Sequence, residues 1–137
     1  MIKTEQQIER DFYSFIKNSP LGKAVKGGVY RDGMRPANAT TEDLIIKFLS
    51  GFDEQVQSGV VIINLYVPDI AYSTDGNKVK DIIRIAELEK LIISFIEENE
   101  DTEYWMQTDG TPISMLNEDI DQNFIYARIK FNRITED

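Results

Sequence analysis

The segment from Val56 to Val67 constrains the fold of this chain more than any other part of the sequence. Its centre, VVIINLYV at residues 60–67, is rich in β-branched side chains and apolar on both faces, which is typical of a strand. Pro68 follows directly, and because proline has no N–H to donate, the strand is predicted to end there. We therefore expect a long strand with both of its faces covered.

Two segments predict helices. In residues 4–17 the apolar side chains recur at helical spacing, Thr4 and Gln7 fit a capping box, and Asn18-Ser19-Pro20 is expected to end the helix. Residues 79–97 predict the main helix, whose apolar arc is wider than packing on one sheet needs. The arc consists of Ile82, Ile85, Ala86, Leu88, Ile92, Ile93, Phe95 and Ile96. We expect part of it to face a neighbouring subunit.

Shorter segments indicate further strands. Residues 21–41 are a basic, glycine-rich connection in which a short strand starts near residues 27–31. Residues 42–49 are compatible with a helix or a strand, and the strand is favoured because a strong strand follows after a short loop. Residues 69–78 are expected to form a polar loop.

The C-terminal third predicts strands as well. Residues 104–108 indicate a strand that meets a hairpin turn signal at Asp109-Gly110 and continues through residues 113–116. In the last strand one face is predicted to hold Ile125, Ala127, Ile129 and Phe131, and the other Phe124, Tyr126, Arg128 and Lys130. The predicted order is α-β-β-β-α-β-β over a single domain of residues 1–137. It indicates an α+β fold with two helices packed on a mainly antiparallel sheet.

The 137 residues include no cysteine and no histidine. Thiol nucleophiles, disulfides and zinc thiolate sites are therefore excluded, and the most common general base is missing. Two acidic runs, Glu97–Asp101 and Glu118–Asp121, lack the spacing of a calcium loop and favour solvated loops. We expect no enzymatic activity, no catalytic residue, no cofactor and no metal site.

Glu89 is the one carboxylate near the centre of the apolar arc of the main helix. Three interpretations stay open for it: an ion pair with a base such as Arg128 or Lys130, a subunit contact, or a catalytic acid. The aromatic side chains Tyr104, Trp105, Phe124, Tyr126 and Phe131 favour core packing or a protein interface, since their acidic surroundings oppose binding of phosphate.

The net charge of −9 is divided unevenly along the chain. Residues 1–35 contain seven bases and four acids, and the remainder contains eight bases and twenty acids. A negative field repels free duplex DNA, so specific nucleic-acid binding is not expected. The split between a basic arm and an acidic body favours head-to-tail self-association, and a solvated acidic surface is the simpler interpretation.

The chain contains no run of 18 apolar residues, and its start, Met1-Ile2-Lys3-Thr4-Glu5, has no apolar signal region. We therefore expect no membrane association and a cytoplasmic location.

Three segments carry a resemblance to a known family: YRDG at residues 30–33, EDLII at residues 42–46, and QSGVVIINLYVP at residues 57–68. Together with the predicted element order they resemble the tail-completion, or tail-terminator, proteins of tailed phages and prophages. The resemblance implies a subunit that forms a ring, commonly a hexamer, which caps the tail tube and joins it to the head connector. It implies other virion proteins as partners, duplex DNA passing through the ring, and no catalytic residues.

The leading hypothesis is therefore a structural, ring-forming subunit that ends up in the virion. Tyr30, Arg31 and Arg35 are predicted partner contacts, because the two arginines lie beside turn signals, where side chains reach outward. The alternative is a small acidic binding module, of the inhibitor or immunity type, that acts on a basic protein. A cation-dependent hydrolase that uses Glu89 or the acidic runs is the third hypothesis.

Overall fold

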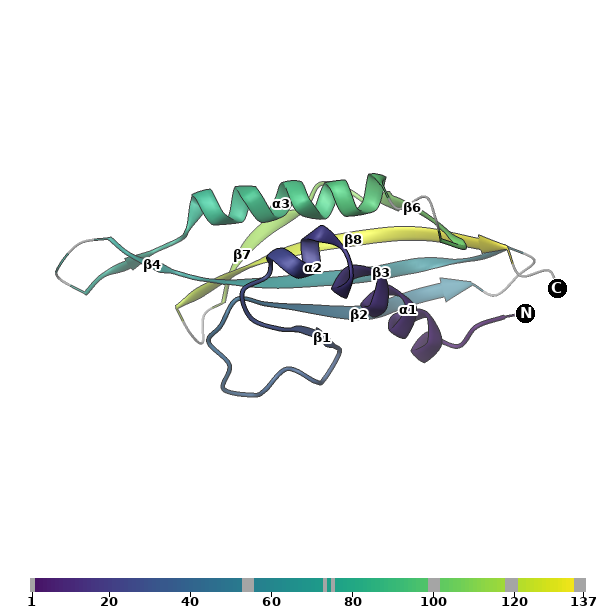
Figure 1. Cartoon of the computed structure of the whole chain (residues 1–137), viewed down its shortest axis with the longest axis horizontal. Coiled ribbons are helices and arrows are strands. Elements are labelled where there is room, and N and C mark those ends of the chain that lie inside the picture. Colours follow the sequence, from purple (N-terminus) through teal and green to yellow (C-terminus); the bar gives the residue numbers. More distant parts are fainter. Residues whose placement is uncertain are drawn as a thin grey trace.

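The fold is built around two long strands, β3 (Val56–Pro68) and β8 (Gln122–Ile134), which pair antiparallel along their whole length (Figure 1). The computed structural model describes residues 2–52, 56–72, 74, 76–98, 102–117 and 121–134. As predicted, β3 ends at Pro68, and alternate side chains of both strands point to opposite faces of the sheet.

Four further strands complete a mixed sheet. On one side of the central pair, β2 (Asp43–Phe52) lies antiparallel to β3, and β1 (Val29–Arg31) lies parallel to β2. On the other side, β6 (Tyr104–Thr108) and β7 (Ile113–Asn117) both lie antiparallel to β8. The strand predicted at residues 42–49 is confirmed, and the parallel β1 makes the sheet mixed rather than only antiparallel.

The hairpin predicted at Asp109-Gly110 is wrong. β6 pairs with residues 129–133 of β8 and β7 with residues 122–126, so the two strands follow each other along one edge instead of pairing together. Gly110 has the positive φ of 89° that a turn needs, and the Asp109 N–H donates to the Arg128 carbonyl at 2.9 Å. The Asp-Gly signal therefore marks a local bend. Because β8 is long enough to pair with both β6 and β7, the chain after the bend pairs with β8 rather than with β6.

The described residues form three helices, where two were predicted. Helix α1 (Glu5–Lys17) begins with the predicted capping box of Thr4 and Gln7. A short helix, α2 (Pro20–Ala24), follows, with Ser19 as its cap and Pro20 in its first turn. Helix α3 (Ile82–Glu97) begins at the cap residue Asp81, slightly later than predicted.

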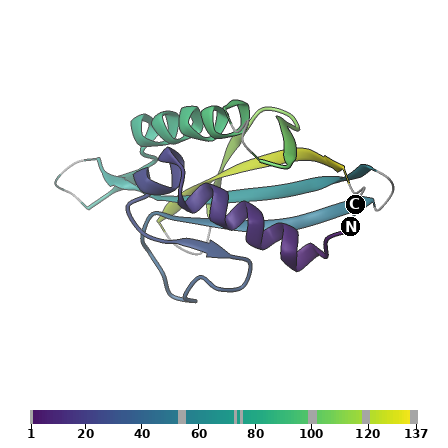
Figure 2. The same cartoon turned by 45° about the vertical axis from the view of Figure 1, so that its right-hand side comes forward.

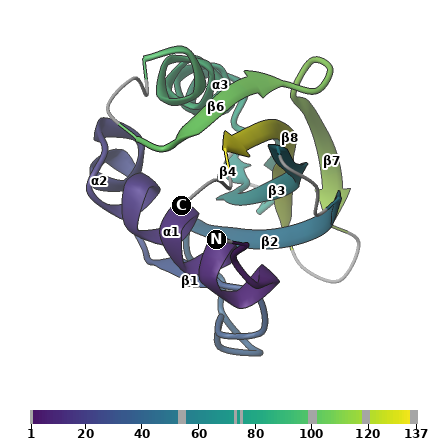
Figure 3. The ribbon, with the colours of Figure 1, turned by 90° about the vertical axis from the view of Figure 1, so that its right-hand side faces the viewer.

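All three helices lie on the same side of the sheet (Figures 2 and 3). One hydrophobic core joins them to that face, and its largest side chains include Phe12, Tyr104 and Phe131, whose ring centroids are 5.0–5.6 Å apart. The α+β class is therefore confirmed. The expectation that both faces of β3 are covered is met only in part, because the helices pack on one face and the segment 32–41 lies over one end of the other.

Between β3 and α3 the chain extends beyond the sheet as a narrow ribbon (Figure 1). There β4 (Ile70–Ala71) and β5 (Lys78–Val79) pair antiparallel, within the segment predicted to be a polar loop. No helix in the described residues is long and apolar enough to span a bilayer.

Candidate interaction surfaces

The three predicted partner contacts lie in β1 and in the segment after it. Tyr30 is half-buried, and its ring packs so closely over Gly28 that an added Cβ there would lie 2.6 Å from the ring. Arg31 binds α1: its Nε donates to Glu9 Oε1 at 2.9 Å, and its Nη2 donates to the Gln6 carbonyl at 2.9 Å. Arg31 therefore fastens the edge strand to the first helix.

Arg35 is also held within the fold. Its Nε lies 2.9 Å from Asp43 Oδ2, and its guanidinium carbon stacks 4.1 Å from the centre of the Tyr66 ring. Asp43 also accepts hydrogen bonds from the Gly28 N–H and the Thr41 hydroxyl, both at 2.7 Å. Burial alone raises the pKa of Asp43, but these hydrogen bonds and Arg35 outweigh burial and lower it.

The two arginines thus bind the chain's own carboxylates, although turn-flanking side chains were expected to reach outward. The side chain of Arg35 is only 12% exposed, which leaves little of it for a partner. Arg31 and Arg35 have a defined role within the fold, and the role of Tyr30, Arg31 and Arg35 in partner binding stays a prediction.

A second buried ion pair, Glu42–Arg84, was missed by the sequence reasoning. Arg84 Nε and Nη2 donate to the two carboxylate oxygens of Glu42 at 2.7 and 2.9 Å, and Nη2 also donates to the Ala24 carbonyl at 2.7 Å. The Lys26 N–H donates to Glu42 at 2.8 Å. The Glu42 side chain is 4% exposed. The pair therefore joins β2, α3 and the end of α2 at one point.

The ionisation of this pair follows from its contacts. Burial alone raises the pKa of Glu42, but hydrogen bonds from Arg84 and the Lys26 N–H lower it below the ordinary range. The hydrogen bond to Glu42 raises the pKa of Arg84. The only sequence signal was the pair Glu42-Asp43 at the start of an apolar strand, where acids are usually depleted.

Helix α3 exposes part of its apolar arc, as the width of the arc predicted. Within the arc Ile82 is 69% exposed, Ala86 is exposed and Ile93 is half-buried, and Ile83, which was not placed in the arc, is 76% exposed. We call these four residues the α3 ridge. A hollow of about 600 Å³ between α3 and the edge of the sheet contains Ala86 and Ile93 together with Thr111 and Pro112. Apolar side chains in this arrangement are suited to burial against another protein.

Glu89 lines the same hollow and is half-buried. Within the described residues it forms no ion pair, and Arg128 pairs instead with Asp109 at 2.9 Å. The ion pair predicted between Glu89 and Arg128 or Lys130 is therefore not formed in the described part of the chain. The other two interpretations of Glu89, a subunit contact and a catalytic acid, stay predictions.

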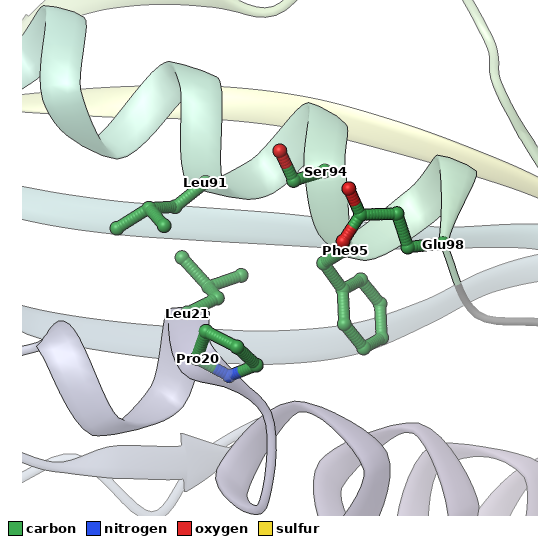
Figure 4. A pocket seen from close by; sticks show the side chains of 6 residues that line it. All are labelled: Pro20, Leu21, Leu91, Ser94, Phe95 and Glu98. Atoms are coloured by element: carbon green, nitrogen blue, oxygen red, sulfur yellow. The ribbon is translucent and has the colours of Figure 1, made fainter.

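A smaller hollow, of about 340 Å³, separates α2 from α3 (Figure 4). Pro20 and Leu21 of α2 face Leu91 and Phe95 of α3, and the Ser94 hydroxyl lies at its margin. Glu98 lines it as well, so its walls combine apolar side chains with the polar groups of Ser94 and Glu98 and favour no single class of ligand.

The aromatic residues divide between the two faces of the sheet. Tyr104 and Phe131 are buried in the core, as the core interpretation predicted. Trp105 is 72% exposed, and Phe124 and Tyr126 lie half-buried on the face that the helices leave uncovered. No group of three acidic side chains suited to a metal lies in the described residues, and parts of both acidic runs fall outside them.

No model of a known protein family matches this chain, and a search of curated proteins finds no significant match.

Proposed function

We propose that this chain is a structural subunit of a phage or prophage tail, which forms a ring that joins the tail tube to the head connector. The proposal rests on the resemblance of residues 30–33, 42–46 and 57–68 to tail-completion proteins. In this proposal the protein is made in the cytoplasm and assembled into the virion, where other virion proteins and further copies of itself are its partners.

The observation that carries self-association is the α3 ridge. Ile82 and Ile83 are more than two-thirds exposed and lie next to each other on one helix. Exposed apolar side chains that gather at one place favour contact with another protein, because burying them releases ordered water. A ring gives every copy such a contact without leaving one unpaired.

The charge supports the same proposal in a second way. A chain of net charge −9 presents a negative field to duplex DNA, so a ring of such chains lets DNA pass without holding it.

The test is the mass in solution, measured by light scattering on a sizing column at low and moderate salt and over a range of concentrations. A discrete mass near six subunits, with a central opening in electron micrographs, is the expected result. The double variant Ile82→Lys, Ile83→Lys is expected to elute as a folded monomer, because both side chains are exposed in the single chain. Lys17→Ala, an exposed position on α1 away from the α3 ridge, is the control and is expected to assemble normally.

The second candidate is the acidic binding module, which the net charge of −9 favours. It predicts a monomer or dimer at all concentrations and salt-sensitive capture of one basic protein. If that pattern is found, and the Ile82→Lys, Ile83→Lys variant elutes and binds like the parent chain, the binding module is favoured over the ring.

A further inference from the structure

The sheet face opposite the helices is covered at one end only. There the segment 32–41 folds over it, with Arg35 stacked on Tyr66 and Gln122 donating to the Thr41 carbonyl at 3.2 Å. At the other end no described helix lies over the strands. We call that end the open sheet face. It consists of Lys47, Val60, Ile62, Trp105, Gln107, Arg128 and Lys130.

These residues share one face because of the strand register. Lys47 of β2 and Arg128 of β8 are both paired with Ile62 of β3, and Lys130 is paired with Val60. Ile62 is only 7% exposed although no helix covers it, and it lies between Lys47 and Arg128, whose long side chains are of a kind that covers apolar neighbours. The open sheet face therefore has an apolar middle flanked by cations, with the exposed Trp105 at its edge.

Its charge is opposite to that of the chain as a whole. Lys47 and Lys130 form no ion pair within the described residues, whereas Arg128 is paired with Asp109 at 2.9 Å. The chain carries a net charge of −9, so two cations without an ion-pair partner in the described part of the chain stand out on this face. An acidic surface with apolar side chains is the complement that such a face requires.

The α3 ridge supplies that complement within the same sequence. Its isoleucines are flanked on α3 by Glu89 and Glu97, and by Glu87, which pairs with Arg84 at 3.1 Å. Lys90, the one exposed cation in the described part of the helix, lines the same hollow as Ala86, Glu89 and Ile93. The ridge is therefore apolar, with three carboxylates and one ammonium group beside it, and its net charge is opposite to that of the open sheet face.

We propose that the open sheet face of one copy binds the α3 ridge of the next copy. The inference rests on the proposed ring and names the two surfaces that form it. Because α3 packs on the opposite side of the sheet (Figure 3), each copy presents both surfaces at once. The contact is head-to-tail, and such a contact closes into a ring when its rotation allows.

A polyanion such as single-stranded nucleic acid is the competing occupant, since Trp105 offers an exposed stacking surface on the face that also carries Lys130. The observations favour a second copy. The net charge of −9 repels phosphate, and the apolar side chains of the ridge match the apolar middle of the face.

The experiment exchanges charge between the two surfaces. Variant A carries Lys47→Glu and Lys130→Glu, and variant B carries Glu89→Lys and Glu97→Lys. Each alone is expected to weaken self-association by about tenfold or more, because like charges then face each other. An equimolar mixture is expected to assemble again, because the acidic face of A accepts the basic ridge of B, and the unchanged ridge of A fits the unchanged face of B.

The controls separate this contact from general charge effects. Lys17→Glu with Lys23→Glu makes the same charge change as variant A at two exposed positions on α1 and α2, and is expected to assemble like the parent chain. Circular dichroism checks that each variant is folded. A photo-reactive side chain placed at Trp105 is expected to crosslink to peptides of α3 in a band of twice the monomer mass.

The outcomes distinguish the inference from the proposed function. If the parent chain assembles and variants A and B assemble equally well, the proposed contact is wrong and the ring forms through another surface. If the parent chain stays monomeric at all concentrations and gives no crosslink from Trp105 to α3, both fail. If a single-stranded oligonucleotide binds the parent chain but not variant A, and the crosslink is absent, the open sheet face binds a polyanion and not a second copy.

Discussion

Replacing Arg84 with methionine is expected to destabilise the fold by about 3–5 kcal/mol, the usual cost of removing one partner from a buried ion pair. The substitution leaves the carboxylate of Glu42, which is 4% exposed, with the Lys26 N–H as its remaining donor in the described contacts. It also removes the hydrogen bond to the Ala24 carbonyl, a loss of about 1 kcal/mol. The bond from Arg84 to Glu87 adds little, because Glu87 is mostly exposed.

The expected loss of stability comes from leaving the buried carboxylate of Glu42 charged and unpaired, rather than from losing its attraction to Arg84. If that reasoning is right, removing the charge as well should recover stability, although a second residue has been changed. The double variant Arg84→Met, Glu42→Met is therefore expected to be more stable than Arg84→Met alone, since two apolar side chains leave no unpaired charge behind.

The pH dependence gives a second test with a definite sign. In the parent chain Glu42 has a pKa below that of the unfolded chain, which is roughly 4.3. Its contribution to stability is therefore fully present above that unfolded value and is lost as the pH falls through the lower, folded pKa. Without Arg84, burial is expected to raise the pKa of Glu42 above the unfolded value. Protonation then removes the free-energy cost of burying an unpaired carboxylate. The difference in stability between parent and variant should therefore shrink as the pH falls below about 5.

The measurement is urea unfolding followed by circular dichroism, at about pH 7 and at about pH 4. Lys90→Met removes a cation from the same helix at an exposed position and is expected to change stability by less than about 0.5 kcal/mol. A cost below about 1 kcal/mol for Arg84→Met, a double variant less stable than the single one, or a cost independent of pH would refute the reasoning.

Two further substitutions test the interior. The side-chain oxygen of Asn64 is buried without a hydrogen-bond partner among the described residues. Asn64→Leu is therefore expected to raise the free energy of unfolding by about 1 kcal/mol. A lower free energy of unfolding, measured with urea, would contradict this. The Tyr104 hydroxyl donates to Asp11 Oδ2 at 2.7 Å, so Tyr104→Phe is expected to cost about 1.5–3 kcal/mol at neutral pH; an unchanged urea midpoint would show that the bond contributes nothing.

Much of the secondary structure could be predicted because its signals are local. The capping box of Thr4 and Gln7, the alternation in the last strand and the stop at Pro68 each depend on residues close together in the chain. Helix α2 was missed although its signal was present, since Ser19-Pro20 was interpreted only as the end of the preceding helix. The same dipeptide starts the next one, with serine as cap and proline in the first turn.

The candidate surfaces were less predictable. The width of the apolar arc correctly indicated that part of α3 is exposed, because helical periodicity alone shows when one helix carries too many apolar positions. The roles of Arg31 and Arg35 within the fold were not visible, since their carboxylate partners depend on which elements meet. Arg31 and Glu9 are 22 positions apart, and Arg84 and Glu42 are 42 apart.

The sequence by itself determined helices α1 and α3, the long strands β3 and β8, the α+β class and the excess of apolar surface on α3. These properties follow from side-chain periodicity and capping, which act over a few residues. The tertiary structure decided the parallel pairing of β1, the placement of β6 and β7 along one edge of β8, and the uncovered basic face in an acidic chain. Those features depend on register and packing between distant segments, because a charge or an apolar side chain acquires its surroundings only when the sheet has formed.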